Sequence, residues 1–381
     1  MARTVTWDDL RGLAAFRAQA GCAVSLYVNL DPRVVPTPGD VAARLNALLD
    51  EAAKAERADA NDLGRDARQG LRADLDRIRR YFDSEFDRSG AGGVAVFCAG
   101  LDGLWAPIPA TEPVPDGVHV DRTLHLAPLV PLVGRGEGAL VVFATREQGR
   151  FYRMRAGRLH EVTDLSDEQP GRHDQGGWSQ ARFQRHIDKL VSDHLREVAD
   201  EIDRRIRRAS GDLEVVIVSP EETRGELAGV LSREVQAALV GWSQGEAHAT
   251  ASDLEELVRP LLDEARAKAE RELAERWREA AGRNGRATAG WAATLDAASD
   301  ARVETLLVAG GADREAWRCP SCGRASASPG ECPLDGTALE PMARGLEAAV
   351  GLTLQHGGTV CVLESAADLG PAEGIGALLR F

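Results

Sequence analysis

The chain has 381 residues, of which 44% are apolar and 28% are charged, and its formal net charge is −14 at pH 7. This length predicts two or three domains, and the composition is typical of a globular protein. No apolar run approaches about 18 residues and the N-terminus shows no signal-peptide pattern, so we expect a cytoplasmic protein without a membrane partner. The acidic balance argues against DNA as a partner.

Residues 1–126 are expected to form an N-terminal α/β domain. Helical stretches rich in Ala, Leu, Arg and Asp alternate there with short apolar strands. The predicted elements are a helix at 8–18, a buried strand at 22–30, a nearly continuous helical stretch at 40–86, and paired strands at 93–99 and 104–108. Nothing in this domain indicates chemistry, and we expect it to act as a scaffold or a partner contact.

Residues 127–251 are predicted to form a second domain around a mixed sheet. An apolar strand at 139–144 precedes two alternating strands at 150–155 and 158–163, which a hairpin joins. A long helix follows, and its apolar residues form one stripe at helical spacing: Ile187, Leu190, Val191, Leu195, Val198, Ile202 and Ile206. A buried strand at 213–218 then leads through Ser219, expected to open a capping box, into another helix. Three strands followed by helix, strand and helix predict an RNase H-like fold.

A polar segment between the hairpin and the long helix contains the sequence Gly176-Gly177-Trp178-Ser179-Gln180. Paired glycines can take positive φ and let the backbone approach a ligand closely. The amide of Gln180 is an uncharged donor and acceptor that can position a water molecule. The alternative interpretation is a flexible start of the helix, with Ser179 as its N-cap.

The charge is unevenly distributed along the chain. Residues 135–208 hold 15 basic and 13 acidic side chains, whereas the chain as a whole is strongly acidic. Only this middle part has a charge balance that tolerates an RNA surface. A solvated helix face of mixed charge explains the same balance equally well.

Residues 252–381 are predicted to form a compact α/β/α domain. We expect a helix at 253–281 that Pro260 interrupts, a second helix after residue 291, a strand at 303–309, a helix at 345–355 and a strand at 359–363. A cysteine-rich knuckle at 317–337 is inserted after the first of these strands. The other three cysteines sit singly in apolar runs and are expected to be buried free thiols: Cys22, Cys98 and Cys361.

The knuckle has the spacing of a zinc ribbon, with two turns that each begin Cys-Pro. Its candidate ligands are Cys319, Cys322, Cys332 and Asp335. Three thiolates and one carboxylate are an allowed ligand set, although four thiolates or imidazoles are commoner. A structural zinc and an empty, degenerate knuckle both remain open. We expect no catalytic cofactor, because no water-activating neighbours accompany the cysteines.

Three motifs, in this order, resemble the archaeal and eukaryotic class 1 peptide-chain release factors, their bacterial relatives and the peptidyl-tRNA hydrolase of ribosome quality control. The first is the segment 176–180, which stands where those factors carry a Gly-Gly-Gln or Gly-Gly-Ser-Gln loop. The second is Gly290, a helix and the strand that begins Val303-Glu-Thr-Leu-Leu. The third is the tail Gly-Ile-Gly-Ala-Leu-Leu-Arg-Phe at 374–381.

This resemblance implies a peptidyl-tRNA hydrolase that acts on ribosome-bound or stalled peptidyl-tRNA, with the large ribosomal subunit and its rRNA as partners. It implies a ribosomal-protein-like C-terminal domain. The catalytic loop would comprise Gly176, Gly177, Ser179 and Gln180. Contacts to RNA would come from Trp178, Arg172, Arg182 and Arg185, by stacking and by phosphate binding. Trp178 as a hydrophobic staple, and the arginines as a solvated face, are the plain alternatives.

Two departures from the family limit what is carried over. The N-terminal domain lacks an Asn-Ile-Lys-Ser loop and a Tyr-x-Cys-x-x-x-Phe run, so stop-codon decoding is not expected. Trp178 stands between the glycines and Ser179, which moves the glycines one residue further from Gln180. A factor that occupies the ribosomal A site without hydrolysis therefore remains the alternative. A small-molecule enzyme is disfavoured, because the clustered carboxylates of metal-dependent nucleases are missing.

Overall fold

A computed structural model describes residues 3, 5–55, 64–133, 138–155, 158–166, 178–209, 213–246, 248–282, 285–364 and 366–381. The chain divides into two units. Unit 1 comprises Met1–Gly136 and Ala269–Phe381, and unit 2 comprises Glu137–Lys268. No helix within the described ranges is long and apolar enough to cross a membrane.

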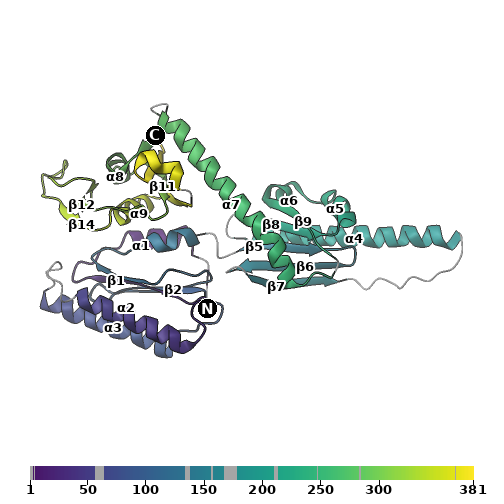
Figure 1. Cartoon of the computed structure of the whole chain (residues 1–381), viewed down its shortest axis with the longest axis horizontal. Helices are drawn as coiled ribbons and strands as arrows, with labels where there is room; N and C mark the ends of the chain where they lie inside the picture. Colours follow the sequence, from purple (N-terminus) through teal and green to yellow (C-terminus); the bar gives the residue numbers. More distant parts are fainter. Residues whose placement is uncertain are drawn as a thin grey trace. The chain divides into compact units, whose positions relative to one another are not determined.

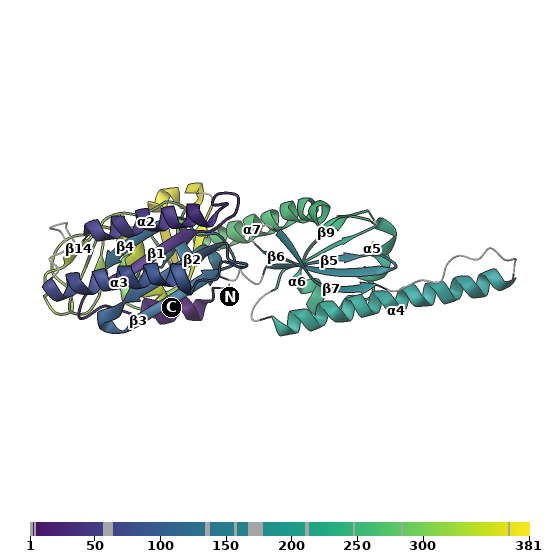
Figure 2. The same cartoon turned by 90° about the horizontal axis from the view of Figure 1, so that it is seen from below.

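The N-terminal part of unit 1 is built on an antiparallel sheet of order β3-β2-β1-β4. Its strands are β1 (Ala23–Asn29), β2 (Gly93–Ala99), β3 (Leu104–Ala110) and β4 (Gly117–Asp121), and its helices are α1 (Trp7–Ala14), α2 (Pro38–Ala55) and α3 (Arg65–Ser84), with a short 3-10 turn η1 (Gly100–Asp102). Helices α2 and α3 lie side by side on one face of the sheet (Figures 1 and 2). The central strands β1 and β2 are buried along nearly their whole length, which explains their mostly apolar sequence.

The sequence-based elements of this part hold with three differences. Helix α1 begins after a capping box formed by Thr6 and Asp9, and it ends at Ala14 instead of residue 18. The helical stretch at 40–86 consists of two helices, whose connection at 56–63 lies outside the described residues. Strand β4 was not predicted, because only two of its five residues are apolar, too few to establish a pattern.

The C-terminal part of unit 1 contains a second sheet, of order β10-β16-β11-β15, in which β11 and β15 are parallel. Its elements are β10 (Ala287–Ala289), α8 (Trp291–Ser299), β11 (Val303–Ala309), α9 (Gly345–Gln355), β15 (Thr359–Leu363), the 3-10 segment η3 (Ala366–Ala372) and β16 (Ile375–Leu379). Helices α8 and α9 cover one face. The last part of α7 (Ala251–Gly282) and η3 cover the other. The predicted α/β/α layering, and the predicted bounds of β11, α9 and β15, are confirmed.

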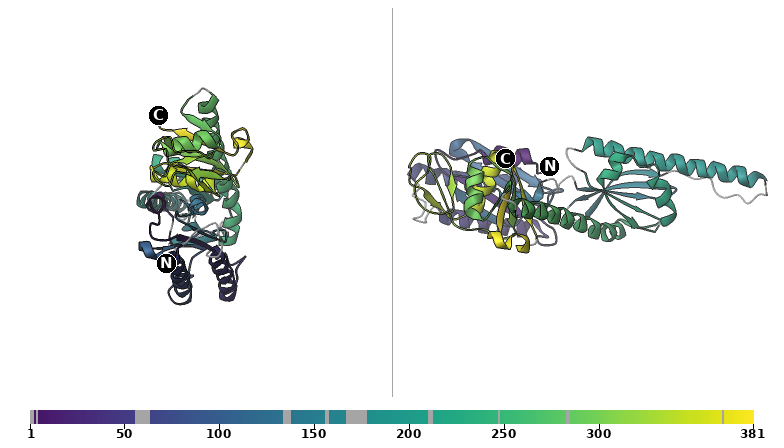
Figure 3. Two further views of the ribbon diagram at one scale, coloured as in Figure 1. Left: turned by 90° about the vertical axis from the view of Figure 1, so that its left-hand side faces the viewer. Right: turned by 90° about the horizontal axis from the view of Figure 1, so that it is seen from above.

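The two ends of the chain share one hydrophobic core. Helix α1 packs against α9, and a single buried cluster contains Leu10 and Phe97 from the N-terminal part together with Trp291 and Leu352 from the C-terminal part. The 3-10 segment η2 (Ala127–Leu132) contributes to the same cluster. Unit 1 is therefore a discontinuous unit in which both terminal segments complete the same core (Figure 3, left).

Unit 2 contains a mixed sheet of order β7-β6-β5-β8-β9. Its strands are β5 (Ala139–Ala144), β6 (Gln148–Arg155), β7 (Arg158–Ser166), β8 (Val215–Ser219) and β9 (Leu239–Gln244). The first three form an antiparallel meander, whereas β5, β8 and β9 run parallel to one another. Helices α4 (Trp178–Arg208), α5 (Glu221–Ala228) and α6 (Arg233–Ala238) cover one face, and the first part of α7 covers the other.

Two local predictions in this region are wrong. Helix α7 continues through Pro260, which lies on its exposed side. Water can therefore bind the carbonyl of Glu256, which loses its helical donor. The capping box at Ser219 is absent, since Ser219 ends β8 and the N-cap of α5 is Pro220 without a side-chain hydrogen bond. The Ser219 side chain is buried, and its hydroxyl makes no hydrogen bond to the start of the helix.

Candidate functional site

The start of α4 holds the described part of the Gly-Gly-Trp-Ser-Gln sequence. Arg172, Gly176 and Gly177 lie outside the described residues. Helix α4 begins at Trp178, so Trp178, Ser179 and Gln180 form its first turn, and Arg182 and Arg185 follow in the same helix. Ser179 is thus inside the helix and is not its N-cap. Gln180 lies on a helix, whereas the sequence suggested a loop.

Helix α4 is longer than the sheet that it covers. Within the stretch whose side chains are described, Lys189 and Leu190 are exposed and Val191 is the first buried residue. At 1.5 Å per residue, about 20 Å of helix axis separates Trp178 from Val191. The N-terminal part of α4 accordingly extends past the end of the sheet (Figure 2; Figure 3, right). The backbone of Trp178 and Gln180 therefore lies at the end of α4 that is farthest from the part packed on the sheet.

The other end of α4 is firmly attached to unit 2. Buried side chains between Val191 and Ile202 pack on the sheet. The guanidinium of Arg205, only 13% exposed, forms an ion pair with Glu201 at 2.7 Å and donates to the hydroxyl of Thr163 on β7. Ser232, the N-cap of α6, donates to Asp203 at 2.7 Å. These contacts hold the C-terminal part of α4 against strand β7 and against the start of helix α6.

A second candidate site is the knuckle of unit 1, whose small antiparallel sheet has the order β13-β12-β14. Its strands are β12 (Ala316–Arg318), β13 (Ala325–Ser326) and β14 (Glu340–Met342). The ligand atoms of Cys319, Cys322, Cys332 and Asp335 all lie within 4.8 Å of one another. The Sγ atoms of Cys322 and Cys332 are 3.5 Å apart, and Sγ of Cys319 is 3.7 Å from a carboxylate oxygen of Asp335. The knuckle thus brings together all four predicted ligands, and these spacings are compatible with tetrahedral ligands around one ion.

Two similar turns hold these ligands. In each turn the glycine N–H donates to a cysteine carbonyl at 2.9 Å, from Gly323 to Cys319 and from Gly336 to Cys332. Both glycines have positive φ, 80° and 71°, which a side chain would strain. The N–H of Cys322 donates to the Cys319 sulfur and lowers the pKa of that thiol. A more acidic thiol supplies the thiolate form that binds metal more readily.

The carboxylate of Asp335 is in its charged form, which can bind a cation. The N–H of Thr337 donates to Asp335 at 3.0 Å and lowers the pKa of that carboxyl to about 2. Asp335 is therefore ionised at neutral pH. Together with the Cys319 thiol, it makes the knuckle a credible cation site.

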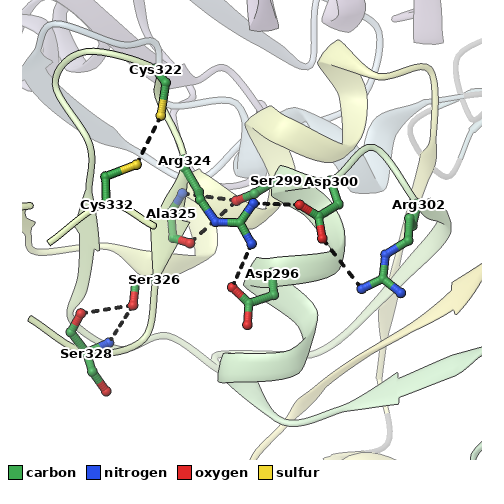
Figure 4. A network of polar contacts seen from close by, with 10 residues as sticks. All are labelled: Asp296, Ser299, Asp300, Arg302, Cys322, Arg324, Ala325, Ser326, Ser328 and Cys332. Atoms are coloured by element: carbon green, nitrogen blue, oxygen red, sulfur yellow. Dashed lines mark hydrogen bonds and ion pairs between the residues drawn. The ribbon is translucent and has the colours of Figure 1, made fainter. Parts of the chain in front are cut away.

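Arg324 joins the knuckle to helix α8. Its guanidinium, 15% exposed, binds Asp300 at 2.5 Å and Asp296 at 3.2 Å. Ser299 accepts a hydrogen bond from the N–H of Ala325 at 3.0 Å. Figure 4 shows this network beside the facing sulfur atoms of Cys322 and Cys332. The knuckle therefore contacts α8 through a small polar interface next to its first turn.

A third cluster was missed by the sequence analysis. The carboxylate of Glu347 on α9 accepts from the N–H of Leu126 at 2.8 Å and from the N–H of Ala127 at 3.2 Å, and one of its oxygens lies 2.6 Å from Nδ1 of His125. The ring centroids of His119 and His125 are 3.8 Å apart. Nothing in the local sequence signals this cluster, because 221 residues separate Leu126 from Glu347.

Comparison with known proteins identifies the class to which the middle of the chain is related. Residues 125–266 match the family described as bacterial archaeo-eukaryotic release factor family 10. A peptide chain release factor subunit 1 from Methanosphaera stadtmanae is 26% identical over 109 residues, which are 28% of this chain and 26% of that protein. The chain thus spans about a quarter of the length of this curated relative. The middle part of the chain is release-factor-like, as its motifs predicted.

Solved structures of translation factors align with most of the chain at low identity. An archaeal translation termination factor, aRF1, is 16% identical, with 99% of both chains covered and a TM-score of 0.28. Pelota from Archaeoglobus fulgidus is 15% identical, with 100% of this chain and 93% of that chain covered and a TM-score of 0.35. Dom34 from S. cerevisiae, a translation termination-like factor, is 10% identical, with 76% and 79% covered and a TM-score of 0.40.

Proposed function

We propose that the protein is a release-factor-like hydrolase of ribosome-bound or stalled peptidyl-tRNA. The observation that carries this proposal is the match to a release-factor family, because residues 125–266 include the complete Gly-Gly-Trp-Ser-Gln sequence and all of α4. Stop-codon reading is not part of the proposal, since the N-terminal sequence lacks both decoding motifs. A ribosomal substrate places its action in the cytoplasm.

The proposed reaction is ester hydrolysis. Water adds to the carbonyl carbon that links the peptide to the 3′ ribose, the tetrahedral intermediate collapses, and the products are a peptide carboxylate and a tRNA with a free 3′ hydroxyl. Such a reaction needs a placed water and donors for the oxyanion. Gln180 supplies the amide that positions water. Its place in the first turn of α4 supports a second role, because backbone N–H groups there lack acceptors within the helix.

The remaining residues of this segment serve insertion and docking. Gly176 and Gly177 have no side chains, so they keep the segment that enters the ribosome narrow. Ser179 is the remaining residue of the proposed catalytic segment. Trp178 stacks on a nucleobase of the tRNA end or of the large-subunit rRNA. Phosphates are bound by three arginines: Arg172, Arg182 and Arg185. The extension of α4 beyond its sheet supports this proposal, since it gives the segment reach.

We also propose the domain assignment on which this function depends. The strand order β7-β6-β5-β8-β9, with an antiparallel meander followed by two parallel strands, supports an RNase H-like catalytic domain at 127–251. Two further sheets are formed by residues that precede and follow this domain in the sequence. They support an N-terminal domain at 1–126 and a ribosomal-protein-like C-terminal domain at 252–381, with the knuckle at 317–337.

The knuckle is proposed to bind a structural zinc ion through Cys319, Cys322, Cys332 and Asp335. Three thiolates and a carboxylate suit zinc, and four protein ligands leave no open position for a reacting water. Bound zinc would cross-link the two glycine turns and stabilise the small sheet. It has no part in the proposed hydrolysis.

The alternative function is a factor that occupies the ribosomal A site without hydrolysis. The specific observation in its favour is Trp178, which separates the glycines from Ser179 and adds a bulky side chain where the family pattern has none. Both functions require ribosome binding, and only the first requires ester cleavage.

The experiment that separates them uses the full-length protein and ribosomes that carry labelled peptidyl-tRNA. Peptide release and ribosome co-sedimentation are measured for wild type, for Gln180→Ala and for the control Gln69→Ala on the exposed side of α3. We expect Gln180→Ala to lower release by about 10-fold or more without weakening binding, because a transition-state contact is removed. Equal, background-level release by wild type and Gln180→Ala, with tight binding by both, would refute hydrolysis and establish the alternative.

A further inference from the structure

The three cysteines of the knuckle differ in their access to solvent. Cys322 is exposed, whereas Cys319 is fully buried and the side chain of Cys332 is only 3% exposed. The oxidation of cysteines is selective for those that are exposed and in the thiolate form. A reagent in solution therefore reaches the sulfur of Cys322 before it reaches the other two.

The exposed thiol has a buried thiol as its neighbour. The Sγ atoms of Cys322 and Cys332 lie 3.5 Å apart and face each other from the two turns of the knuckle (Figure 4). A disulfide bond of about 2.05 Å requires the two sulfurs to come about 1.5 Å closer, a movement of the size that rotation about side-chain bonds supplies. An accessible cysteine beside a second cysteine that can resolve its oxidised form is typical of thiols that react reversibly with peroxides.

The third cysteine makes contacts of its own. Sγ of Cys319 accepts a hydrogen bond from the N–H of Cys322 at 3.4 Å and lies 3.7 Å from a carboxylate oxygen of Asp335. Because Asp335 stands where a fourth cysteine would complete a four-thiolate knuckle, the site has no second pair of thiols. We therefore expect oxidation to join Cys322 to Cys332 and to leave Cys319 reduced.

We propose that Cys322 and Cys332 form a reversible disulfide when the protein reacts with a hydroperoxide, so that the knuckle is a modification site as well as a metal site. The thiolate of Cys322 attacks one oxygen of hydrogen peroxide, the O–O bond breaks, and hydroxide leaves a sulfenic acid behind. The thiolate of Cys332 then attacks the sulfur of that sulfenic acid. The S–S bond forms, the S–O bond breaks, and a second hydroxide leaves. The two sulfurs together lose the two electrons that reduce the peroxide.

The disulfide removes two of the four ligands proposed for zinc. A thiolate binds the metal, whereas the sulfur of a disulfide does not, and only Cys319 and Asp335 remain. Oxidation therefore releases the ion, and reduction by a dithiol restores the site. The release of zinc rests on the metal site proposed above, whereas the disulfide itself requires only the two thiols.

The test exposes the full-length protein, with and without added zinc, to hydrogen peroxide under native conditions and then alkylates the remaining thiols. Trypsin cleaves after Arg318 and after Arg324, so Cys319 and Cys322 lie on one peptide and Cys332 lies on the next. We expect mass spectrometry to find these two peptides cross-linked and dithiothreitol to separate them. In the zinc-loaded protein, a colorimetric chelator should detect the release of zinc in step with the cross-link.

Two variants and one control identify the sulfurs. Cys322→Ser should abolish the cross-linked pair of peptides, whereas Cys319→Ser should keep it. The half-buried Cys361 is an internal reference, and the cross-link should form at least about 10-fold faster than Cys361 is oxidised, because exposure favours reaction. The control Cys361→Ala should leave the rate of cross-linking unchanged.

Four results would overturn the inference: no cross-linked pair in the wild type, a bond between Cys319 and Cys322 instead, loss of the pair in Cys319→Ser, or a cross-link that forms no faster than Cys361 is oxidised. A rapid cross-link in a protein that binds no zinc at any stage supports the disulfide and rejects the proposed metal site. The two proposals therefore fail in different ways.

Discussion

Replacing Glu347 should destabilise unit 1. The side chain is 9% exposed and accepts two hydrogen bonds, from the N–H of Leu126 at 2.8 Å and the N–H of Ala127 at 3.2 Å, and its carboxylate lies 2.6 Å from Nδ1 of His125. In Glu347→Ala these donors lose their acceptor within the shared core of the N-terminal and C-terminal parts.

The magnitude follows from the number of donors left unpaired. Each buried N–H without an acceptor costs about 1–3 kcal/mol, and removal of one partner of a buried ion pair costs about 3–5 kcal/mol. We therefore expect Glu347→Ala to lower the free energy of unfolding by about 3–5 kcal/mol, and Glu347→Gln, which keeps one acceptor oxygen, by about 1–2 kcal/mol.

Urea unfolding followed by tryptophan fluorescence measures this effect, with Trp291 as a buried reporter that is 3% exposed. Hydrogen exchange should show β2 and β11 losing protection together, because their residues belong to one core cluster. The control Glu51→Ala changes an exposed glutamate on α2 and should stay within about 0.5 kcal/mol of wild type. A loss below about 1 kcal/mol in Glu347→Ala, or loss of protection in only one sheet, would refute this reasoning.

Three further predictions concern the same unit. Burial is the main cause that lowers the pKa of His119 from its ordinary value of 6.5 to about 3 in the folded protein. Unfolding therefore takes up a proton below about pH 6.5. The melting temperature of the protein should fall as the pH is lowered from about 6.5 to 3, and it should fall less steeply in His119→Gln. Cys322→Ser should reduce the zinc content per chain measured by elemental analysis, whereas Cys361→Ala, outside the knuckle, should leave it unchanged; equal zinc in both variants would rule out the proposed ligand set. Arg324→Gln removes the contacts of a largely buried guanidinium with Asp296 and Asp300. It should lower the free energy of unfolding, measured in urea, by about 1–2 kcal/mol. An effect no larger than that of Arg65→Gln would show that the contact between the knuckle and α8 does not stabilise the protein.

The sequence alone predicted the elements whose signal is local. Continuous apolar runs located β1, β2, β5 and β8, and the apolar stripe that includes Leu195 and Ile202 located α4. The spacing of the knuckle residues predicted a cluster because two short turns bring their own ligands together, with little help from the rest of the chain. The release-factor resemblance likewise rested on short ordered motifs, and the family match confirms it for residues 125–266.

Boundaries and weak elements were harder to predict. Strand β4 is stable because it pairs with β1, which no pattern within its five residues reveals. Pro260 is tolerated in α7 because it lies on the solvent side, a fact that depends on which face of the helix packs. Ser219 looked like a cap but ends a strand, since the sheet extends one residue further than its sequence suggested.

Interactions between distant residues were decided only by the tertiary structure. The shared core of the two chain ends, and the meeting of His119, His125 and Arg344 with Glu347, require segments more than 200 residues apart to fold together. Sequence periodicity reports which face of an element is buried, but it does not report which other element covers that face. The residues of the cluster around Glu347 carry no local signal in the sequence, and their proximity is a property of the fold.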